Sequence, residues 1–554
     1  MQDDPNNNEP EEEAIPEPEG DTEIIETDYR IGQDNITPRL GPLGLDIHNP
    51  VFVVSGLVVV AFVVITILFQ DSAGPAFESL RTWLTERFDW FFLIAGNVFV
   101  ILCLALIVSP LGKVRLGGKE ATPDFTYVGW FSMLFAAGMG IGLMFFGVLE
   151  PAYYFGTPWG DQPLGNVLGI VDGAIAEPEA VESARRMAMA ATIFHWGLHP
   201  WAVYAIVALA LALFSYNKGL PLTIRSMFYP LFGERIWGWP GHIIDILAVF
   251  ATLFGLSTSL GIGASQANAG LNFVFGVPSS VNAQVILILI ITAFALVSVL
   301  RGLEGGVKLL SEINMGLAGL LLLFVIIVGP TLGIITGFFG NLWAYAEEIV
   351  PLSTPFGRED DGFRQGWTSF YWAWWISWSP FVGMFIARVS RGRTVREFIT
   401  CVLIVPSIVS VLWMTAFGGT AIQQLIDSAS DAAVFSYVID SYVPELSLFG
   451  MLSELPLSSV TSLIGIVLVI VFFVTSSDSG SLVIDTITAG GKVNAPVSQR
   501  VFWATFEGLV AIALLLGGGL GALQAMAVST GLPFAIVLLL GCYAIVVGLM
   551  REPR

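Results

Sequence analysis

Long apolar runs separated by short polar connections dominate this sequence. A helix needs about 20 mostly apolar residues to cross the hydrocarbon core of a bilayer. Runs that meet this requirement lie at about 50–70, 90–110, 125–150, 187–214, 241–275, 284–300, 311–339, 367–388, 397–421, 457–485, 500–518 and 523–549. The pattern therefore predicts an all-α polytopic membrane protein with twelve transmembrane helices, several of them long enough to tilt or to contain breaks.

The basic residues alternate between successive connections. With the N-terminus inside, the connections and the C-terminus on the inner side carry sixteen of the 24 lysines and arginines, and the outer connections carry six. Lysine and arginine are enriched in cytoplasmic loops. The alternation therefore predicts a multi-pass protein with cytoplasmic N- and C-termini, and a wrong helix count would break it midway.

The composition agrees with a lipid-covered surface. Only 12% of the residues are charged, against about 25% in soluble proteins. Much of the net charge of -21 comes from residues 1–28, which hold twelve acids and no base. Such a segment buries too little apolar surface to fold alone, so residues 1–45 are predicted to be an acidic, disordered cytoplasmic tail. An acidic chain disfavours nucleic-acid binding. We find no metal motif, nucleotide loop or nucleophile–base pair, so neither an enzyme nor a bound cofactor is expected.

Two of the runs contain stretches that a plain lipid-facing helix does not need. The third contains Gly138-Met139-Gly140-Ile141-Gly142, and the eighth contains a tryptophan cluster followed by Pro380. Interrupted helices in matching positions of two halves are typical of inverted-repeat secondary transporters. This predicts repeats at 125–339 and 367–549, two additional helices within 46–110, and a short cytoplasmic C-terminus at 550–554. Close helix packing through the glycines is the competing explanation.

Aromatic residues gather in the middle of two runs. Trp374, Trp375 and Trp378 lie in the eighth, and Trp201 and Tyr204 lie in the fourth. Spacings of three and four place such residues on one helix face. Aromatic faces attract a cation without hydrogen-bonding it, which suits a quaternary ammonium group. An aromatic packing core is the alternative for any single residue. The nearby His195 and His199 are interpreted as structural.

Hydroxyl residues in the tenth run could hold the coupling ion. The run contains Phe472, Thr475 and Ser476. Transporters place oxygen ligands for small cations beside broken helices. Hydrogen bonding between helices explains serine and threonine equally well at this point.

These residues together resemble the betaine/choline/carnitine transporter family, from about residue 43 to 550. The matching strings are the glycine stretch with Glu150-Pro151, the block His195–Tyr204, the block Trp367–Arg393, and Thr475–Ser479. The resemblance implies a leucine-transporter-type core of two inverted five-helix repeats, preceded by two helices and assembled as a homotrimer in a prokaryotic inner membrane. It implies substrate binding by Trp196, Trp201, Tyr204, Trp374, Trp375, Trp378, Gly138, Met139, Gly140 and Gly142.

The resemblance also implies where sodium binds. One site is formed by Ala136, Met139, Phe472, Thr475 and Ser476, partly through backbone oxygens. A second site in sodium-coupled members corresponds to Thr252 and Phe381, but Leu256 stands where a second threonine belongs. Leucine offers no oxygen, so this site is altered or shifted, with Ser257 as a candidate.

Two features of the sequence favour one kind of transporter within this family. Choline-transporting members tend to carry aspartate at the position of Gly142, whereas glycine suits a zwitterion such as glycine betaine. Sodium-independent exchangers of the family replace the methionine of the glycine stretch and place an arginine near the sodium position. This chain keeps Met139 and has no lysine or arginine from 236 to 300. We therefore expect a symporter that imports glycine betaine with sodium as an osmoprotectant. The alternatives are carriage of choline, carnitine, proline betaine or ectoine, a sodium-independent exchanger, and an osmosensing receptor without transport.

Overall fold

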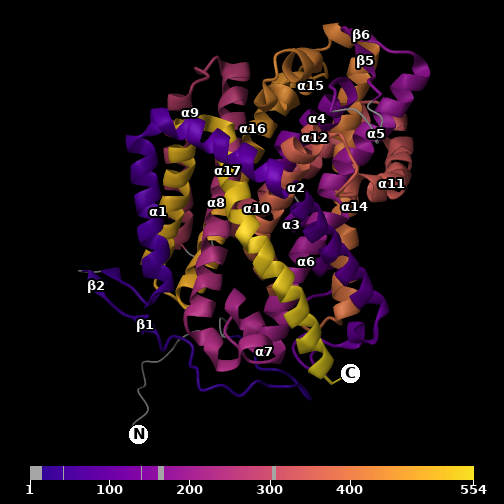
Figure 1. Cartoon of the computed structure of the whole chain (residues 1–554). Coiled ribbons are helices and arrows are strands. Elements are labelled where there is room, and N and C mark those ends of the chain that lie inside the picture. Colours follow the sequence, from indigo (N-terminus) through magenta and orange to yellow (C-terminus); the bar gives the residue numbers. More distant parts are fainter. Residues whose placement is uncertain (1–14, 41–42, 139, 160–166, 302–306, 554) are drawn as a thin grey trace.

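The computed structural model describes residues 15–40, 43–138, 140–159, 167–301 and 307–553, and these residues are nearly all helical (Figure 1). Helices satisfy their backbone hydrogen bonds internally, as lipid demands. The α-helices are α1 (Val51–Leu68), α2 (Gln70–Val108), α3 (Tyr127–Gly138), α4 (Ile141–Gly156), α5 (Pro178–Trp196), α6 (Leu198–Ala212), α7 (Tyr229–Phe232), α8 (Trp239–Phe275), α9 (Val281–Arg301), α10 (Val307–Val328), α11 (Thr331–Ser353), α12 (Asp361–Phe363), α13 (Ser369–Val389), α14 (Val395–Ser428), α15 (Ser447–Ser453), α16 (Ser458–Thr488) and α17 (Val497–Arg551).

Among the described residues, three short antiparallel strand pairs lie outside the helices. The strands are β1 (Asn35–Ile36) paired with β4 (Ile47–His48), β2 (Arg39–Leu40) paired with β3 (Leu43–Gly44), and β5 (Ile170–Val171) paired with β6 (Ala174–Ile175). Residues Asn35 and His48 are opposite each other in the first pair. The first two pairs precede α1, and the third lies between α4 and α5.

By length and apolar composition, nine helices within the described ranges can cross a membrane, or ten when the bent pair α3 and α4 counts as one span. The chain is therefore a multi-pass membrane protein. The difference between ten and the expected twelve has two sources. Helix α17 joins two helices across a kink at Gly518 and Gly519, and α13, with 21 residues, is not among the nine. The count of twelve, the domain boundaries and the repeat topology stay predictions.

Burial separates central from peripheral helices. The most apolar window of residues 178–217, which form α5, α6 and the π-helical turn Leu213–Asn217, is 94% buried, but that of α10 is only 22% buried. Helix α13 packs against α6, α8 and α17, and α16 packs against α8. An apolar helix that is buried all round belongs to the interior, while a helix that exposes apolar residues faces lipid. The interior helices are the ones that carry the predicted site.

Pro380 does not interrupt its helix, contrary to expectation. Helix α13 runs unbroken from Ser369 to Val389. A proline in a helix cannot bond to the carbonyl four residues earlier, which is that of Ile376. Here the Ser379 hydroxyl donates to that carbonyl at 2.6 Å. Because a side chain replaces the missing donor, the helix continues.

The N-terminal segment from residue 15 is docked, which corrects the predicted disorder for the part that the structure describes. Its Glu19 pairs with Arg391 at 2.5 Å, and Glu23 pairs with Lys218 at 2.8 Å. Lys218 also pairs with Glu552 at 2.7 Å, and the Thr22 hydroxyl donates to the Glu552 carboxylate at 2.9 Å. The segment and the C-terminus thus lie together at one end of the molecule, the lower end in Figure 1.

Candidate functional site

The glycine stretch breaks a span at the centre of the molecule. Helices α3 and α4 meet at an angle of 63°, and Gly140 between them is extended, with φ of -174° and ψ of -177°. Gly138 ends α3, and Met139 lies outside the described residues. Gly142 sits against two indoles. A Cβ atom at this position would be 2.6 Å from Cη2 of Trp196 and 3.2 Å from Cη2 of Trp374. Glycine therefore lets the rings approach the backbone.

The six predicted aromatic residues line one cavity. Trp196, Trp201 and Tyr204 contribute from α5 and α6, and Trp374, Trp375 and Trp378 contribute from α13. We call these six side chains the aromatic cage. Gly140 and Gly142 line the same cavity, and so do Ala137, Ser259 and Ser410, which the sequence did not single out. The structure thus brings together residues from the third, fourth and eighth predicted spans.

The cage rings are oriented by their own hydrogen bonds. Trp374 donates its indole N–H to the Ser259 hydroxyl at 3.1 Å, and Trp375 donates to the His195 carbonyl at 2.9 Å. The Trp378 indole donates to the Gly255 carbonyl at 2.9 Å. The Trp374 and Trp375 rings stack at 4.9 Å. Since these three N–H groups already have protein partners, the rings offer their π faces to the cavity, and such faces bind cations that have no N–H of their own.

A second, larger cavity begins at the cage. Ala137, Gly140, Trp378 and Val382 line both cavities. The second cavity then extends along α13 and α16 to Arg388 and Val483, toward the helix ends beside the docked N-terminal segment. Its empty volume is about 1250 Å³, open solvent included. The cage therefore communicates with the end of the molecule that holds the termini.

The predicted first sodium site gathers in this second cavity. Ala136, Phe472, Thr475 and Ser476 all line it. The Thr475 hydroxyl donates within its own helix to the Val471 carbonyl at 3.0 Å. A hydroxyl that donates once keeps lone pairs for a cation. The arrangement offers oxygen ligands from α16 opposite the break after α3.

The residues of the predicted second sodium site do not meet in either of these two cavities. Phe381 lines the larger cavity, but Thr252 is fully buried and donates to the Ala248 carbonyl at 2.7 Å. A Cβ atom on Gly480 of α16 would lie 2.3 Å from Cδ1 of Leu256. The Ser257 hydroxyl donates to the Glu507 carbonyl of α17 at 3.1 Å, so it faces away from both cavities.

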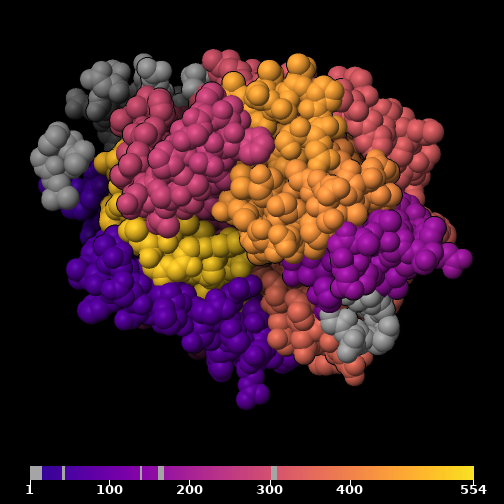
Figure 2. Space-filling view, turned by 90° about the horizontal axis from the view of Figure 1, so that it is seen from above, coloured from indigo at the N-terminus to yellow at the C-terminus, as the bar shows by residue number. Residues whose placement is uncertain are grey.

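Aromatic side chains fill the space on the other side of the cage. The ring of Tyr153 is 5.1 Å from that of Trp367 and 5.5 Å from that of Tyr442. Phe146 lies between this group and the cage, 5.9 Å from Trp374. Figure 2, the view from above, shows orange residues that follow α14 over the middle of this end. The cage is thus covered on the side opposite the termini.

A buried glutamate behind the cage was not predicted. Glu150 of α4 is fully buried, and its Oε2 accepts from the Trp196 indole at 2.8 Å and from the Tyr371 hydroxyl at 2.7 Å. Its Oε1 is 2.5 Å from Nδ1 of His195, and Nε2 of His195 is 2.9 Å from the Thr368 hydroxyl. An acid inside a membrane span is by itself a sign of function. That signal was present in the sequence, but its partners come from other spans.

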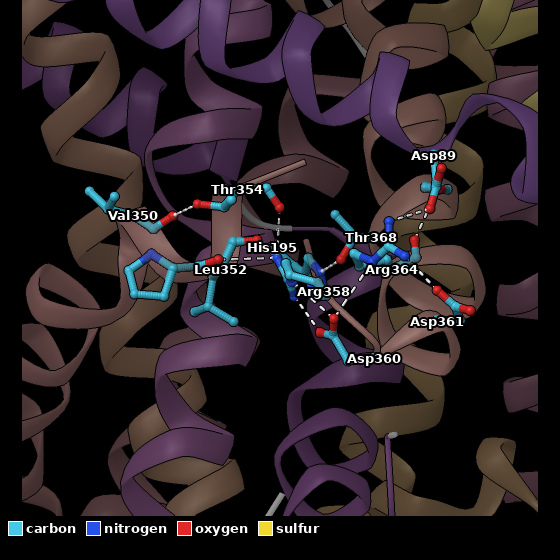
Figure 3. Close-up of polar contacts among 12 residues, drawn as sticks. Asp89, His195, Val350, Leu352, Thr354, Arg358, Asp360, Asp361, Arg364 and Thr368 are labelled. Carbon is cyan, nitrogen blue, oxygen red and sulfur yellow. Dashed lines mark hydrogen bonds and ion pairs between the residues drawn. The ribbon is translucent and has the colours of Figure 1, made fainter. Parts of the chain in front are cut away.

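The start of α13 is fixed by a buried ion cluster beside His195 (Figure 3). Arg358 pairs with Asp360, and Arg364 pairs with Asp89 of α2 at 2.5 Å. Arg364 belongs to the π-helical turn Arg364–Thr368, which leads into α13. Breaking a buried ion pair leaves an uncompensated charge and is costly. The cluster therefore anchors the helix that carries three of the six cage residues.

Comparison with known proteins identifies close relatives. A family model described as "BCCT, betaine/carnitine/choline family transporter" matches residues 50–554. The chain is 62% identical to the glycine betaine/proline/choline transporter of Vibrio parahaemolyticus, over 98% of this chain and 97% of that protein. It is 55% identical to glycine betaine transporter 1 of the same organism, over 96% and 98%. It is 43% identical to the glycine betaine transporter of Bacillus subtilis, over 88% and 92%.

Proposed function

Because the chain belongs to the betaine/carnitine/choline family of transporters, we propose that it imports glycine betaine together with sodium ions. The family and these relatives are transporters and not enzymes. The proposal adds a substrate, a coupling ion and a direction to that assignment. Each rests on a different part of the site.

The aromatic cage carries the choice of substrate. Four of its five indole N–H groups already bond to protein oxygens, so the ring faces remain for a trimethylammonium group. Gly142 approaches Trp196 too closely to leave room for an acidic side chain without ring movement. A carboxylate there would also repel that of a zwitterion. Each of the three relatives has glycine betaine in its name, which supports the same substrate.

The larger cavity supports the coupling ion. Backbone oxygens of Ala136 and Phe472, with the hydroxyls of Thr475 and Ser476, would hold one sodium ion beside the break between α3 and α4. Met139 would belong to both the ion and substrate sites. Sodium binding would order the break and favour the form open on the other side, which the substrate then occupies. The second site, at Thr252 and Phe381, would differ in this chain because Leu256 offers no oxygen.

We further propose that the protein has twelve spans and two inverted five-helix repeats. It would form a homotrimer in a prokaryotic inner membrane with both termini in the cytoplasm. The larger cavity would then face the cytoplasm, and the structure would be an inward-facing state of an alternating-access cycle. Import of a compatible solute would protect the cell against high external osmolality.

Transport of other solutes is the main alternative. The relative from Vibrio parahaemolyticus with 62% identity is named for proline and choline as well as glycine betaine. Carnitine, ectoine and proline betaine would also fit a family of this kind. A sodium-independent exchanger would use the same cage without the ion site.

Uptake into proteoliposomes tests the proposal. Radiolabelled glycine betaine uptake is measured with an inward sodium gradient, and with potassium in place of sodium, at matched osmolality. We expect sodium-dependent uptake that is lost in Trp378→Leu, because Trp378 lines both cavities. Equal uptake in potassium would reject sodium coupling and favour the exchanger. No betaine uptake in either condition would reject the substrate.

A further inference from the structure

Trp196 differs from the other cage tryptophans in where its backbone lies. It is the last residue of α5, and the chain changes direction at Gly197, which has φ of -97° and ψ of -128°. A Cβ atom at Gly197 would be 2.8 Å from the Ile193 carbonyl oxygen and 2.9 Å from the Tyr345 hydroxyl. The Trp196 ring packs against those of Trp375 and Tyr371, with centroids 4.9 and 5.6 Å away. The orientation of the Trp196 ring therefore depends on what its side chain binds.

Its indole binds a carboxylate, whereas the other three cage indoles with assigned partners bind neutral oxygens. Oε2 of Glu150 accepts from Nε1 of Trp196 at 2.8 Å, and the same oxygen accepts from the Tyr371 hydroxyl at 2.7 Å. Neither Glu150 nor Tyr371 lines the cage cavity. Hydrogen bonds to an ionised acceptor are roughly twice as strong as neutral ones. Glu150 is thus an anchor behind the cage and not a substrate ligand.

The histidine of this network completes the set of donors. Nδ1 of His195 lies 2.5 Å from Oε1 of Glu150, and its Nε2 lies 2.9 Å from the Thr368 hydroxyl, as Figure 3 shows for the latter pair. The His195 carbonyl accepts from the Trp375 indole at 2.9 Å. With Nδ1 protonated, three donors converge on the two carboxylate oxygens. Such convergence stabilises an ionised, buried carboxylate.

We propose that Glu150 is a positioning residue of the aromatic cage whose negative charge acts through the Trp196 indole N–H. Hydrogen-bonded groups polarise one another in a low-dielectric interior. An indole that donates to a carboxylate gains electron density on its ring, and a more negative ring face attracts a quaternary ammonium group more strongly. Glu150 therefore fixes the Trp196 ring and increases its affinity for cations. This inference rests on the proposed function, because it presumes a quaternary ammonium in the cage.

Replacing Glu150 by glutamine separates charge from geometry. The amide oxygen of Glu150→Gln still accepts from Trp196, but the charge is gone. Binding of radiolabelled glycine betaine to the purified full chain is measured together with thermal unfolding. We expect the Kd of Glu150→Gln to rise about tenfold, since a cation–π contact is of that order. Tyr371→Phe removes one donor and keeps the carboxylate, so its Kd should change by less than about threefold.

A carbon isostere distinguishes the charge effect from general damage. The tert-butylacetate anion has the shape of glycine betaine, with carbon in place of the quaternary nitrogen. Its competition against betaine should weaken by less than about twofold in Glu150→Gln, so the preference of the protein for betaine falls. Equal loss for both compounds would overturn the charge effect, and an unchanged betaine Kd would overturn the whole inference.

Glu552→Gln is a matched control. Glu552 is also buried and accepts from three side chains, at 2.7 Å from Lys218, 2.9 Å from Thr22 and 3.3 Å from Asn217. It lies at the termini, away from the cage, so we expect lower thermal stability with an unchanged betaine Kd. A rise in Kd equal to that of Glu150→Gln would overturn the inference. If the wild-type protein binds no betaine, the proposed function itself has failed, and this result is distinct from all the others.

Discussion

Replacing Gly142 by alanine adds one methyl group to the wall of the aromatic cage. The new Cβ would lie 2.6 Å from Cη2 of Trp196 and 3.2 Å from Cη2 of Trp374. Carbon atoms pack best at about 3.5–4.0 Å, so the Trp196 ring must retreat by about 1 Å. Overpacking of this kind costs about 1–3 kcal/mol. Gly142 lies in the first turn of α4, where alanine regains about 1 kcal/mol of helix propensity. We therefore expect thermal stability close to that of the wild type.

Binding should respond much more than stability does. Each cation–π contact contributes about 0.5–2 kcal/mol, and the methyl group displaces one ring and presses on a second. A loss of about 1–3 kcal/mol corresponds to a Kd increase of roughly 5- to 150-fold for glycine betaine. The assay is radioligand binding to purified protein, with thermal unfolding measured on the same sample.

Gly419→Ala provides the control, because Gly419 lies inside α14 and a Cβ there meets nothing within 4 Å. It should keep the wild-type Kd and gain slightly in stability. If Gly142→Ala binds betaine within twofold of the wild type, the rings are not held at the distances that the structure shows, and the argument for the cage geometry is wrong.

The other predictions concern the ion site, the kink and the docked N-terminal segment. Thr475→Ala should raise the sodium concentration for half-maximal uptake by roughly tenfold through loss of one ligand. Ser477→Ala should leave it unchanged, because the Ser477 hydroxyl donates to Glu507. Equal effects of the two variants would contradict the sodium site. Gly519 has a φ of 62°, so Gly519→Ala should lower the free energy of unfolding by about 1–2 kcal/mol. An unchanged melting temperature in a thermal melt would contradict the kink at this residue. Lys218→Met should cost about 3–5 kcal/mol by leaving buried Glu552 unpaired, and adding Glu552→Gln should restore part of the melting temperature; additive losses would argue against the pair.

The cage could be predicted from the sequence because helix spacing alone places aromatic residues on one face. Trp374 and Trp378 are one turn apart, and the structure brings both to one cavity with Trp201 and Tyr204. The glycine break was equally visible, since three glycines at spacing two weaken a helix wherever they occur. Local patterns of this kind depend on few distant contacts.

The features that sequence analysis missed depend on distant partners. Pro380 was expected to interrupt its helix, but a serine hydroxyl one residue away supplies the missing donor. Glu150 was noticed only as part of a motif, because its donors Trp196 and Tyr371 come from two other spans. Composition predicted disorder for residues 1–45, because composition does not show which distant residues a segment contacts. In the structure, Glu23 of this segment pairs with Lys218. Pairing between segments far apart in sequence decided each of these cases.

The docked N-terminal segment has a consequence for biosynthesis. The segment is made first, yet the Glu552 carboxylate that receives the Thr22 hydroxyl is made 530 residues later. At about 5–20 residues per second, translation separates the two by about 25–110 s. During that time the acidic segment lacks its last partner while the helices enter the membrane one after another. Closure of this contact therefore follows the synthesis of α17, so it can hold the assembled helices together but cannot guide the insertion of the earlier ones.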